Sequence, residues 1–271
     1  MALGGNPVFN SKNYREQTRA AGPTGAASTT YAEQNMSPQA LQDLYSKPSA
    51  SGLQMGRLTY NDVINKTALC LGLVVIGAAI GWQLPALMLV GALVGLVLGL
   101  VNSFKREPSP ILIMLYAGFE GLFLGGISAF FEARYSGIVF QAVLATFSVF
   151  AVTLVLYRSG KYRATPKMTK MFMIALIGYG LFSLLNFVLM LTGVVGGEFG
   201  MRSGGLGLAI GAFAVLLATY ALVLDFTSVS EGVRQGAPAK MAWTAAFGLT
   251  VTLIWLYVEI LRILAILRGN D

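Results

Sequence analysis

Long apolar blocks alternate with short polar breaks along most of the chain, from about Leu69 to near its end. Each block has about 18–23 residues, the length at which an α-helix rising 1.5 Å per residue crosses a hydrocarbon core. Transmembrane strands would need only about ten residues with strict alternation, and no alternation is visible. The pattern therefore predicts seven transmembrane helices, at residues 67–84, 86–104, 111–131, 137–157, 171–192, 205–226 and 245–267.

The polar breaks predict the connections and the orientation. The break around Pro85 is short, so the first two helices should form a hairpin. If the N-terminus is cytoplasmic, 15 of the 19 lysine and arginine residues fall on the cytoplasmic side. Short cytoplasmic loops are enriched in these residues. We therefore expect a cytoplasmic N-terminus and a C-terminus on the other side of the membrane.

Residues 1–55 differ in composition from the rest of the chain. They are rich in Ser, Thr, Gly, Ala, Pro and Gln and have no sustained apolar periodicity. Such a segment buries too little surface to offset the entropy of ordering. We expect residues 1–55 to form a disordered cytoplasmic tail, and residues 56–271 to form the membrane domain.

Composition excludes several classes of function. The chain is 55% hydrophobic and 11% charged, has no histidine, and has one cysteine, Cys70, inside an apolar block. These absences exclude a disulfide framework, a zinc cluster and a histidine-assisted nucleophile. The pI is near 9.6, but the basic residues are scattered between apolar blocks. We therefore expect the lipid bilayer, and no nucleic acid, as a partner.

Glycines recur four residues apart in three of the predicted helices. They form the patterns at 91, 95 and 99, at 121 and 125, and at 207 and 211. Small residues at this spacing let helices approach closely in lipid. A phosphate-binding loop is excluded for the last pair, because no strand precedes it. These glycines are predicted to pack helices together.

Three carboxyl groups fall inside the apolar blocks: Glu120, Asp225 and Glu259. A charged side chain at the bilayer centre costs about 2.5–3.5 kcal/mol on the insertion scale, which indicates a bundle interior or an aqueous cavity. The predicted ends of the blocks place them about 14, 5 and 21 Å from the cytoplasmic boundary, at 1.5 Å per residue. We therefore expect a staggered ladder of acids facing an ion pathway, with calcium bound transiently at Asp225 and Glu120.

Each acid also has a structural interpretation. Glu259 and Arg262 lie three residues apart and could neutralise each other as an ion pair. Asp225 could reach the membrane interface, and Glu120 could stay neutral and bond a neighbouring helix. Thr252 shares the helical face of Glu259 and Arg262, so the last helix could present a polar seam to the bundle.

Three segments carry a resemblance to a known family. The stretches EGLFLGGIS at 120–128, YALVLDF at 220–226 and AAFGLTVTLIWLYVEILRILA at 245–265 resemble the Bax-inhibitor motif family in its bacterial branch. The likeness covers about residues 56–271 and leaves out the tail. It implies an all-α membrane protein of seven helices, six of them wrapped around a central C-terminal helix. It also implies pH-sensitive calcium leak and a bacterial inner or plasma membrane.

The resemblance implies a gate made of two aspartates and one basic residue. Asp225 matches the first aspartate, and Lys105 or Arg106 occupies the basic position after the second helix. Thr252 stands where the family has its second aspartate, and the nearest acid is Glu259, two turns further along. A paired-carboxylate sensor should therefore be absent. Either Asp225 works alone against the basic residue, or proton sensing has moved to Glu120 and Glu259.

Two functions remain open at this stage. The first is a passive, pH-sensitive cation leak channel, with calcium as the expected ion and no resident cofactor. The alternative is a non-transporting membrane adaptor that binds a quality-control protease or another membrane complex through its tail. We expect no enzymatic activity, because no HExxH motif occurs and Asp225 lies in LVLD rather than in a Gly-x-Gly-Asp motif.

Overall fold

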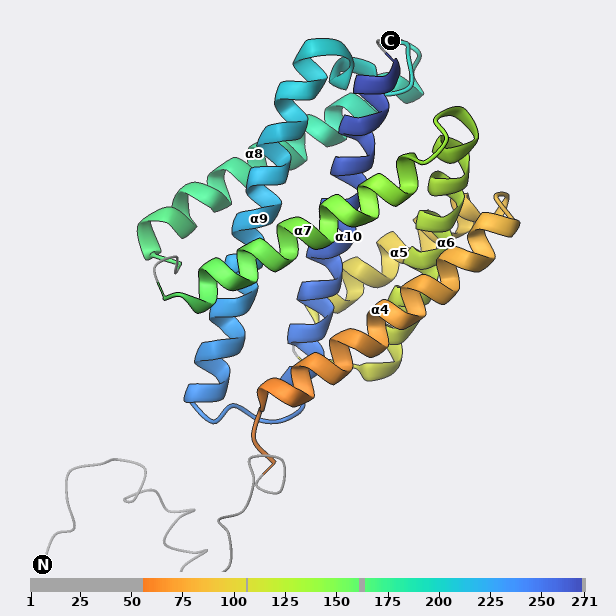
Figure 1. Cartoon of the computed structure of the whole chain (residues 1–271). Coiled ribbons are helices and arrows are strands. Elements are labelled where there is room, and N and C mark those ends of the chain that lie inside the picture. The colour runs from red at the N-terminus through yellow and green to blue at the C-terminus, as the bar shows by residue number, and fades with distance from the viewer. Residues whose placement is uncertain (1–55, 106, 161–163, 270–271) are drawn as a thin grey trace, which may run out of the picture. The chain divides into compact units, whose positions relative to one another are not determined.

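The computed structural model describes residues 56–105, 107–160 and 164–269. This part of the chain forms seven long α-helices and one short 3₁₀ helix, labelled as in Figure 1. They are α4 (Tyr60–Gln83), α5 (Leu87–Phe104), α6 (Pro110–Arg134), α7 (Ile138–Arg158), α8 (Pro166–Leu191), η2 (Gly200–Arg202), α9 (Gly204–Arg234) and α10 (Met241–Gly269). All seven α-helices are long and apolar enough to cross a membrane, which confirms the predicted fold class.

The helix ends follow local signals. Thr59 caps α4 by accepting a hydrogen bond from the backbone N–H of Asp62 at 3.1 Å, and Pro110 and Pro166 occupy first-turn positions of α6 and α8, where a missing N–H costs nothing. At the start of α7, Glu132 accepts backbone hydrogen bonds from Gly137 and Val139 at 2.5 and 3.0 Å. Gly137 has a φ of +79°, a conformation that favours glycine.

Helix α9 is longer than its apolar block. The block was predicted to end at residue 226, whereas the helix continues to Arg234. The next residues are polar but contain no strong helix breaker, and the hydroxyls of Thr227 and Ser228 bond back to carbonyls one turn earlier. Hydropathy therefore located the apolar block of α9 but missed its last two turns.

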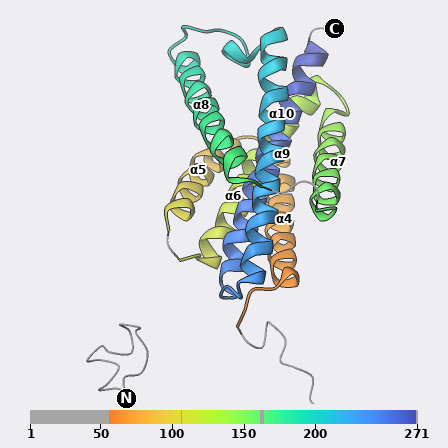
Figure 2. The same ribbon diagram turned by 90° about the vertical axis from the view of Figure 1, so that its left-hand side faces the viewer.

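Helix α10 forms the centre of the bundle. In its most apolar 18-residue window 72% of the residues are buried, against 6% in α8. It packs extensively against α4, α6, α7 and α9, whereas α5 packs mainly against α6, and α8 against α9 and η2. Figures 1 and 2 show α10 surrounded in this way. The predicted central helix is confirmed, with four helices as its immediate neighbours.

The α4–α6 contact depends on glycines. A Cβ atom added at Gly121 or Gly125 would collide with the backbone of α4 at Val74 or Ala78, and one added at Gly77 would collide with the backbone of α6. Gly118, on the same helix α6, has open space at its Cβ position. Bare backbone surfaces therefore meet here, as the spacing predicted.

The two ends of the bundle are distinct. We call the end where α4 and α10 begin and α9 ends the N-terminal face, and the end where α10 ends the C-terminal face (Figure 1). The predicted tail, residues 1–55, lies outside the described residues, as does Arg106.

Candidate functional site

Asp225 and Thr252 lie against each other inside the bundle. The Thr252 hydroxyl donates a hydrogen bond to Asp225 Oδ2 at 2.8 Å, joining α9 to α10. Gly248, one turn before Thr252, keeps the space beside the carboxylate open, since a Cβ there would lie 3.2 Å from Asp225 Oδ1. The face of α9 that carries Asp225 also carries Ala214 and Ala218, both fully buried. The structure thus brings together Asp225 and Thr252 as one acid and one hydroxyl.

Asp225 lies deeper in the bundle than the sequence indicated. It stands nine residues before Arg234, the end of α9, which corresponds to about 14 Å at 1.5 Å per residue. Glu120 stands ten residues after Pro110, the start of α6, or about 15 Å. Measured along their helices, the two acids thus lie about equally far from the helix ends at the N-terminal face. The predicted stagger concerns depth in the membrane, and it stays a prediction.

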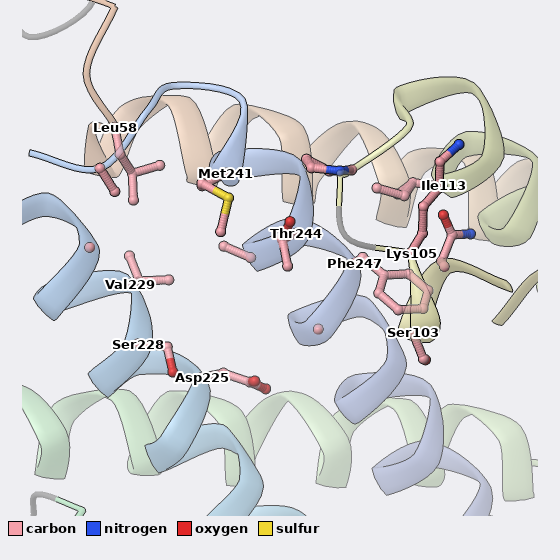
Figure 3. A pocket seen from close by; sticks show the side chains of 16 residues that line it. Leu58, Ser103, Lys105, Ile113, Asp225, Ser228, Val229, Met241, Thr244 and Phe247 are labelled. Carbon is pink, nitrogen blue, oxygen red and sulfur yellow. The ribbon is translucent and has the colours of Figure 1, made fainter. Parts of the chain in front are cut away.

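A cavity of about 470 Å³ near the N-terminal face is bordered by Asp225. Its other polar borders come from α5, α9 and α10 and from the residue that follows α5: they are Asn102, Ser103, Lys105, Ser228 and Thr244. Figure 3 shows Asp225 on one side of this space and Lys105 and Ser103 on the other, with α10 between them. We call it the Asp225 cavity.

The expected latch between Asp225 and a basic residue is only partly realised. Lys105 borders the same cavity as Asp225, but the ion pairs among the described residues do not include one between them. Arg106, the other candidate, lies outside the described residues. In this conformation the hydrogen bond from Thr252 is therefore the direct polar contact of the Asp225 side chain.

A surface ion pair ties two loops together near the same end. Lys240 Nζ lies 2.9 Å from Glu107 Oε1, joining the loop before α10 to the loop before α6. The hydrogen bond from Lys240 holds the pKa of Glu107 below its ordinary value of 4.5. Glu107 therefore stays ionised at neutral pH.

Glu120 borders a second cavity, of about 390 Å³, between α5 and α6. Its carboxylate occupies the space left by the missing side chain of Gly95 on α5, and Tyr116 lies one turn before it in the same lining. We call this space the Glu120 cavity. Among the described residues, neither the side-chain hydrogen bonds nor the ion pairs include Glu120. The expected bond from a neutral Glu120 to a neighbouring helix is therefore not formed here.

Glu259 belongs to a different cluster, toward the C-terminal face. It forms an ion pair with Arg262, as one interpretation of the sequence expected, and a second ion pair with Arg202 at 2.8 Å. Tyr179 of α8 hydrogen-bonds to both Glu259 and Arg202. Glu259 and Arg262 are 4% and 7% exposed. One carboxylate thus faces two guanidinium groups, and the buried cluster has a formal surplus of one positive charge.

Sequence reasoning missed Arg202 and Tyr179 as members of this cluster. Arg202 was placed in the outer loop, where its side chain could have faced water, and it instead lies in η2 directly before α9. Tyr179 is a single polar tip inside an apolar block, a signal too weak to assign a partner.

A third cavity, of about 510 Å³, has a mainly apolar lining. Its few polar borders include Ser128 and Tyr257, which hydrogen-bond to each other at 2.6 Å. It has no acidic residue in its lining, so it offers a cation no charged ligand.

The described residues contain no group of three or more acidic or cysteine side chains placed to hold a metal ion. A calcium ion at Asp225 would therefore take its remaining oxygen ligands from Thr252, Ser228, backbone carbonyls and water. Such a set has one formal negative charge, which suits transient rather than tight binding.

The architecture agrees with a comparison to known protein families. A family model described as Bax inhibitor 1 like matches residues 6–269. The chain belongs to this family. No curated protein matches the chain.

Membership of the Bax inhibitor 1 like family confirms the resemblance and corrects its extent. The match begins at residue 6, whereas the sequence analysis left residues 1–55 outside the likeness. That segment was left out because it has no apolar periodicity. Hydropathy identifies membrane spans but does not show whether a segment belongs to a protein family. Most of the predicted tail is therefore part of the family match.

Within a Bax inhibitor 1 like protein the Asp225–Thr252 contact has a specific meaning. The resemblance implied that Thr252 replaces the second acid of a pair, and the structure places the two side chains in contact at 2.8 Å. This contact is compatible with that alignment. Glu259 lies in a separate cluster with Arg262 and Arg202.

Proposed function

We propose that this protein is a passive cation leak channel, with calcium as its main ion, in the inner or plasma membrane of a bacterium. In this proposal its N-terminus lies in the cytoplasm, because that orientation puts 15 of 19 basic residues on the cytoplasmic side. The protein conducts without catalysing a reaction and holds no resident cofactor.

The Asp225 cavity is the observation that carries the proposal. An ionisable carboxyl group in a membrane-spanning helix is energetically costly. Such groups usually face the interior of the bundle and mark an ion pathway or another functional site. Asp225 borders a space of about 470 Å³ close to the N-terminal face, with hydroxyl groups from Ser228 and Thr244 nearby. These groups supply oxygen ligands to a cation, while the charge of Lys105 at the same cavity offsets the charge of Asp225.

The other half of the bundle supports a closed conformation. Glu259 is fully engaged with Arg202 and Arg262, and the surplus positive charge of that cluster opposes a cation. A buried charge acts strongly on its surroundings because the local dielectric constant is low. Opening therefore requires rearrangement of this cluster or a route that bypasses it.

Protonation of Asp225 is the proposed switch. The ionised carboxylate holds Thr252 by a hydrogen bond and attracts Lys105 across the shared cavity; Glu107 and Lys240 at the surface remain paired with each other. Adding a proton to Asp225 removes its attraction for Lys105 and weakens the hydrogen bond from Thr252, because a neutral acceptor bonds less strongly than a charged one. The contact between α9 and α10 is thereby loosened. Leak should therefore rise as the pH falls.

Calcium efflux from liposomes tests the proposal. Purified protein is reconstituted into vesicles loaded with calcium and a fluorescent indicator, and efflux is followed between about pH 6 and about pH 8. We expect faster efflux than from empty vesicles, and a further increase toward low pH. Equal efflux with and without protein at every pH would remove the channel function.

One observation favours the alternative of a non-transporting adaptor for a membrane protease or another complex. The half of the bundle around Glu259 is filled by ion-paired side chains, as expected of a protein that conducts nothing. Deletion of residues 1–55 discriminates the two functions. An adaptor that uses this segment should lose its protein partners in a pull-down assay, whereas a channel should keep its calcium efflux.

A further inference from the structure

The Asp225 cavity and the Glu120 cavity share part of their walls. Ser103 of α5 and Phe247 of α10 border both spaces. Asp225 borders only the first cavity and Glu120 only the second. These two residues, which we call the partition, are the lining that the two acid-containing cavities have in common.

Phe247 is held in this partition from two sides. Its ring lies edge-on to the ring of Tyr116 on α6, with 5.1 Å between centroids and an interplanar angle of 74°. Tyr116 borders the Glu120 cavity one turn before Glu120. The next residue along α10, Gly248, lies beside Asp225. Two adjacent residues of the central helix thus reach the surroundings of both acids.

We infer that Phe247 is the barrier between two acid-lined cavities, so that a cation passes from Asp225 to Glu120 only when this ring moves. The inference rests on the proposed channel function and specifies how it is regulated. An apolar side chain across a narrow passage blocks ions by excluding water. Figure 3 shows the Phe247 ring beside Ser103 and Lys105, at the border of the Asp225 cavity.

The proposed route also explains how a cation avoids the arginine cluster. A straight path along α10 from Asp225 would meet Arg262 and Arg202. The Glu120 cavity is lined by α5, α6 and the first half of α10, whereas that cluster is built from α8, η2 and the second half of α10. A cation that turns past Phe247 reaches a second carboxylate instead of two guanidinium groups.

Cysteine accessibility tests the barrier without relying on ion flux. In a Cys70→Ala background, Thr244→Cys places a thiol in the Asp225 cavity and Val251→Cys places one in the Glu120 cavity. A positively charged, membrane-impermeant methanethiosulfonate reagent is added to protein in vesicles. We expect the thiol at 244 to react readily and the thiol at 251 to react slowly.

Phe247→Ala should then raise the reaction rate at position 251 by at least about tenfold, which corresponds to removing about 1.4 kcal/mol from the barrier. The reaction rate of the thiol at position 244 should stay within about twofold of its value when Phe247 is present. An unchanged rate there also shows that the variant is folded. Phe104→Ala is the matched control, because Phe104 is 84% exposed and borders neither cavity. Phe247→Val is a milder variant for use if the alanine variant does not fold.

Equal rates at position 251 with Phe247 and with its smaller replacements would overturn the inference. So would an equally large increase in the Phe104→Ala control. A flux assay then separates the two proposals. If Phe247→Ala opens position 251 to the reagent but no variant conducts calcium, the barrier stands and the channel function fails. If it also raises efflux, Glu120→Gln in the same chain should reverse the increase.

Discussion

At the scale of single residues, Asp225 stands as one acid where the family resemblance implies two. Its partner Thr252 donates a hydrogen bond at 2.8 Å but cannot release or store a proton at neutral pH. Any proton sensing at this place therefore rests on Asp225 and on the groups around its cavity. This makes position 252 the most direct place to test the switch.

Thr252→Asp should restore a pair of acids. Two carboxyl oxygens as close as 2.8 Å cannot both belong to ionised groups without a large cost, so the pair keeps a proton that Asp225 alone would release. Because leak is proposed to rise on protonation, its midpoint should move to higher pH in this variant. Efflux measured against pH checks this, with Thr252→Asn as the uncharged control. An unchanged midpoint would contradict the proposed switch.

Replacing Glu259 should lower the stability of the folded protein more than replacing Arg202. Glu259→Gln leaves the buried Arg262 and the partly buried Arg202 without their carboxylate, and an uncompensated buried charge destabilises by about 3–5 kcal/mol. Arg202→Met leaves the Glu259–Arg262 pair neutral and should destabilise less. Thermal unfolding in detergent, followed by circular dichroism, compares the two variants. A larger loss in the Arg202 variant would show that the surplus charge is neutralised in another way.

Glu107→Gln should leave the pH response in the neutral range unchanged. Lys240 lowers the pKa of Glu107, so the ion pair contributes stability above the ordinary pKa near 4.5 and loses it as the pH falls through the lowered value. Between about pH 6 and about pH 8 the pair is therefore constant. A shifted efflux profile in this variant would place the sensor at the surface instead of at Asp225.

At the scale of helices, the sequence was informative about spans and less so about ends. Seven apolar blocks predicted seven helices, all of which are present, because length and hydropathy suffice to identify a span. The end of α9 was missed by two turns, since a polar stretch can remain helical beyond the membrane core. Asp225 therefore lies nine residues before the end of α9 instead of next to it.

The glycine contact between α4 and α6 allows a test within one helix. Gly125→Ala puts a methyl group against the α4 backbone at Ala78, and overpacking of this kind costs about 1–3 kcal/mol. Gly118→Ala adds the same group to α6 in open space and should stabilise the helix by about 0.5–1 kcal/mol. Opposite shifts of the melting temperature in detergent are expected. Equal shifts would show that the contact is loose in the folded protein.

At the scale of the whole molecule, the sequence located the acids but not their neighbours. The resemblance aligned Thr252 with the second aspartate of the family, but its contact with Asp225 became visible only in the structure. The assignment of Glu259 to a cluster with Arg202 and Tyr179 could not be foretold. Partners on different helices depend on helix tilt and rotation, which packing determines and hydropathy does not report. For the same reason the separate cavity of Glu120 was not foreseen.

The described bundle is electrically asymmetric. The N-terminal half holds the Asp225 cavity, and the half toward the C-terminal face holds a buried cluster with a surplus positive charge. This asymmetry favours cation entry from one face and a closed state at the other. A change in the charge of Asp225 should therefore have the largest effect on calcium flux.

Calcium efflux from vesicles that contain the Asp225→Asn variant tests whether the charge on Asp225 keeps the channel closed. The asparagine has nearly the shape of a protonated aspartate and can still accept the Thr252 hydrogen bond, but it has no charge. We predict that the variant shows fast calcium efflux that no longer depends on pH. Wild type should show slow efflux near about pH 8 that rises toward about pH 6. Efflux from the variant that matches wild type in rate and in pH dependence would contradict the account.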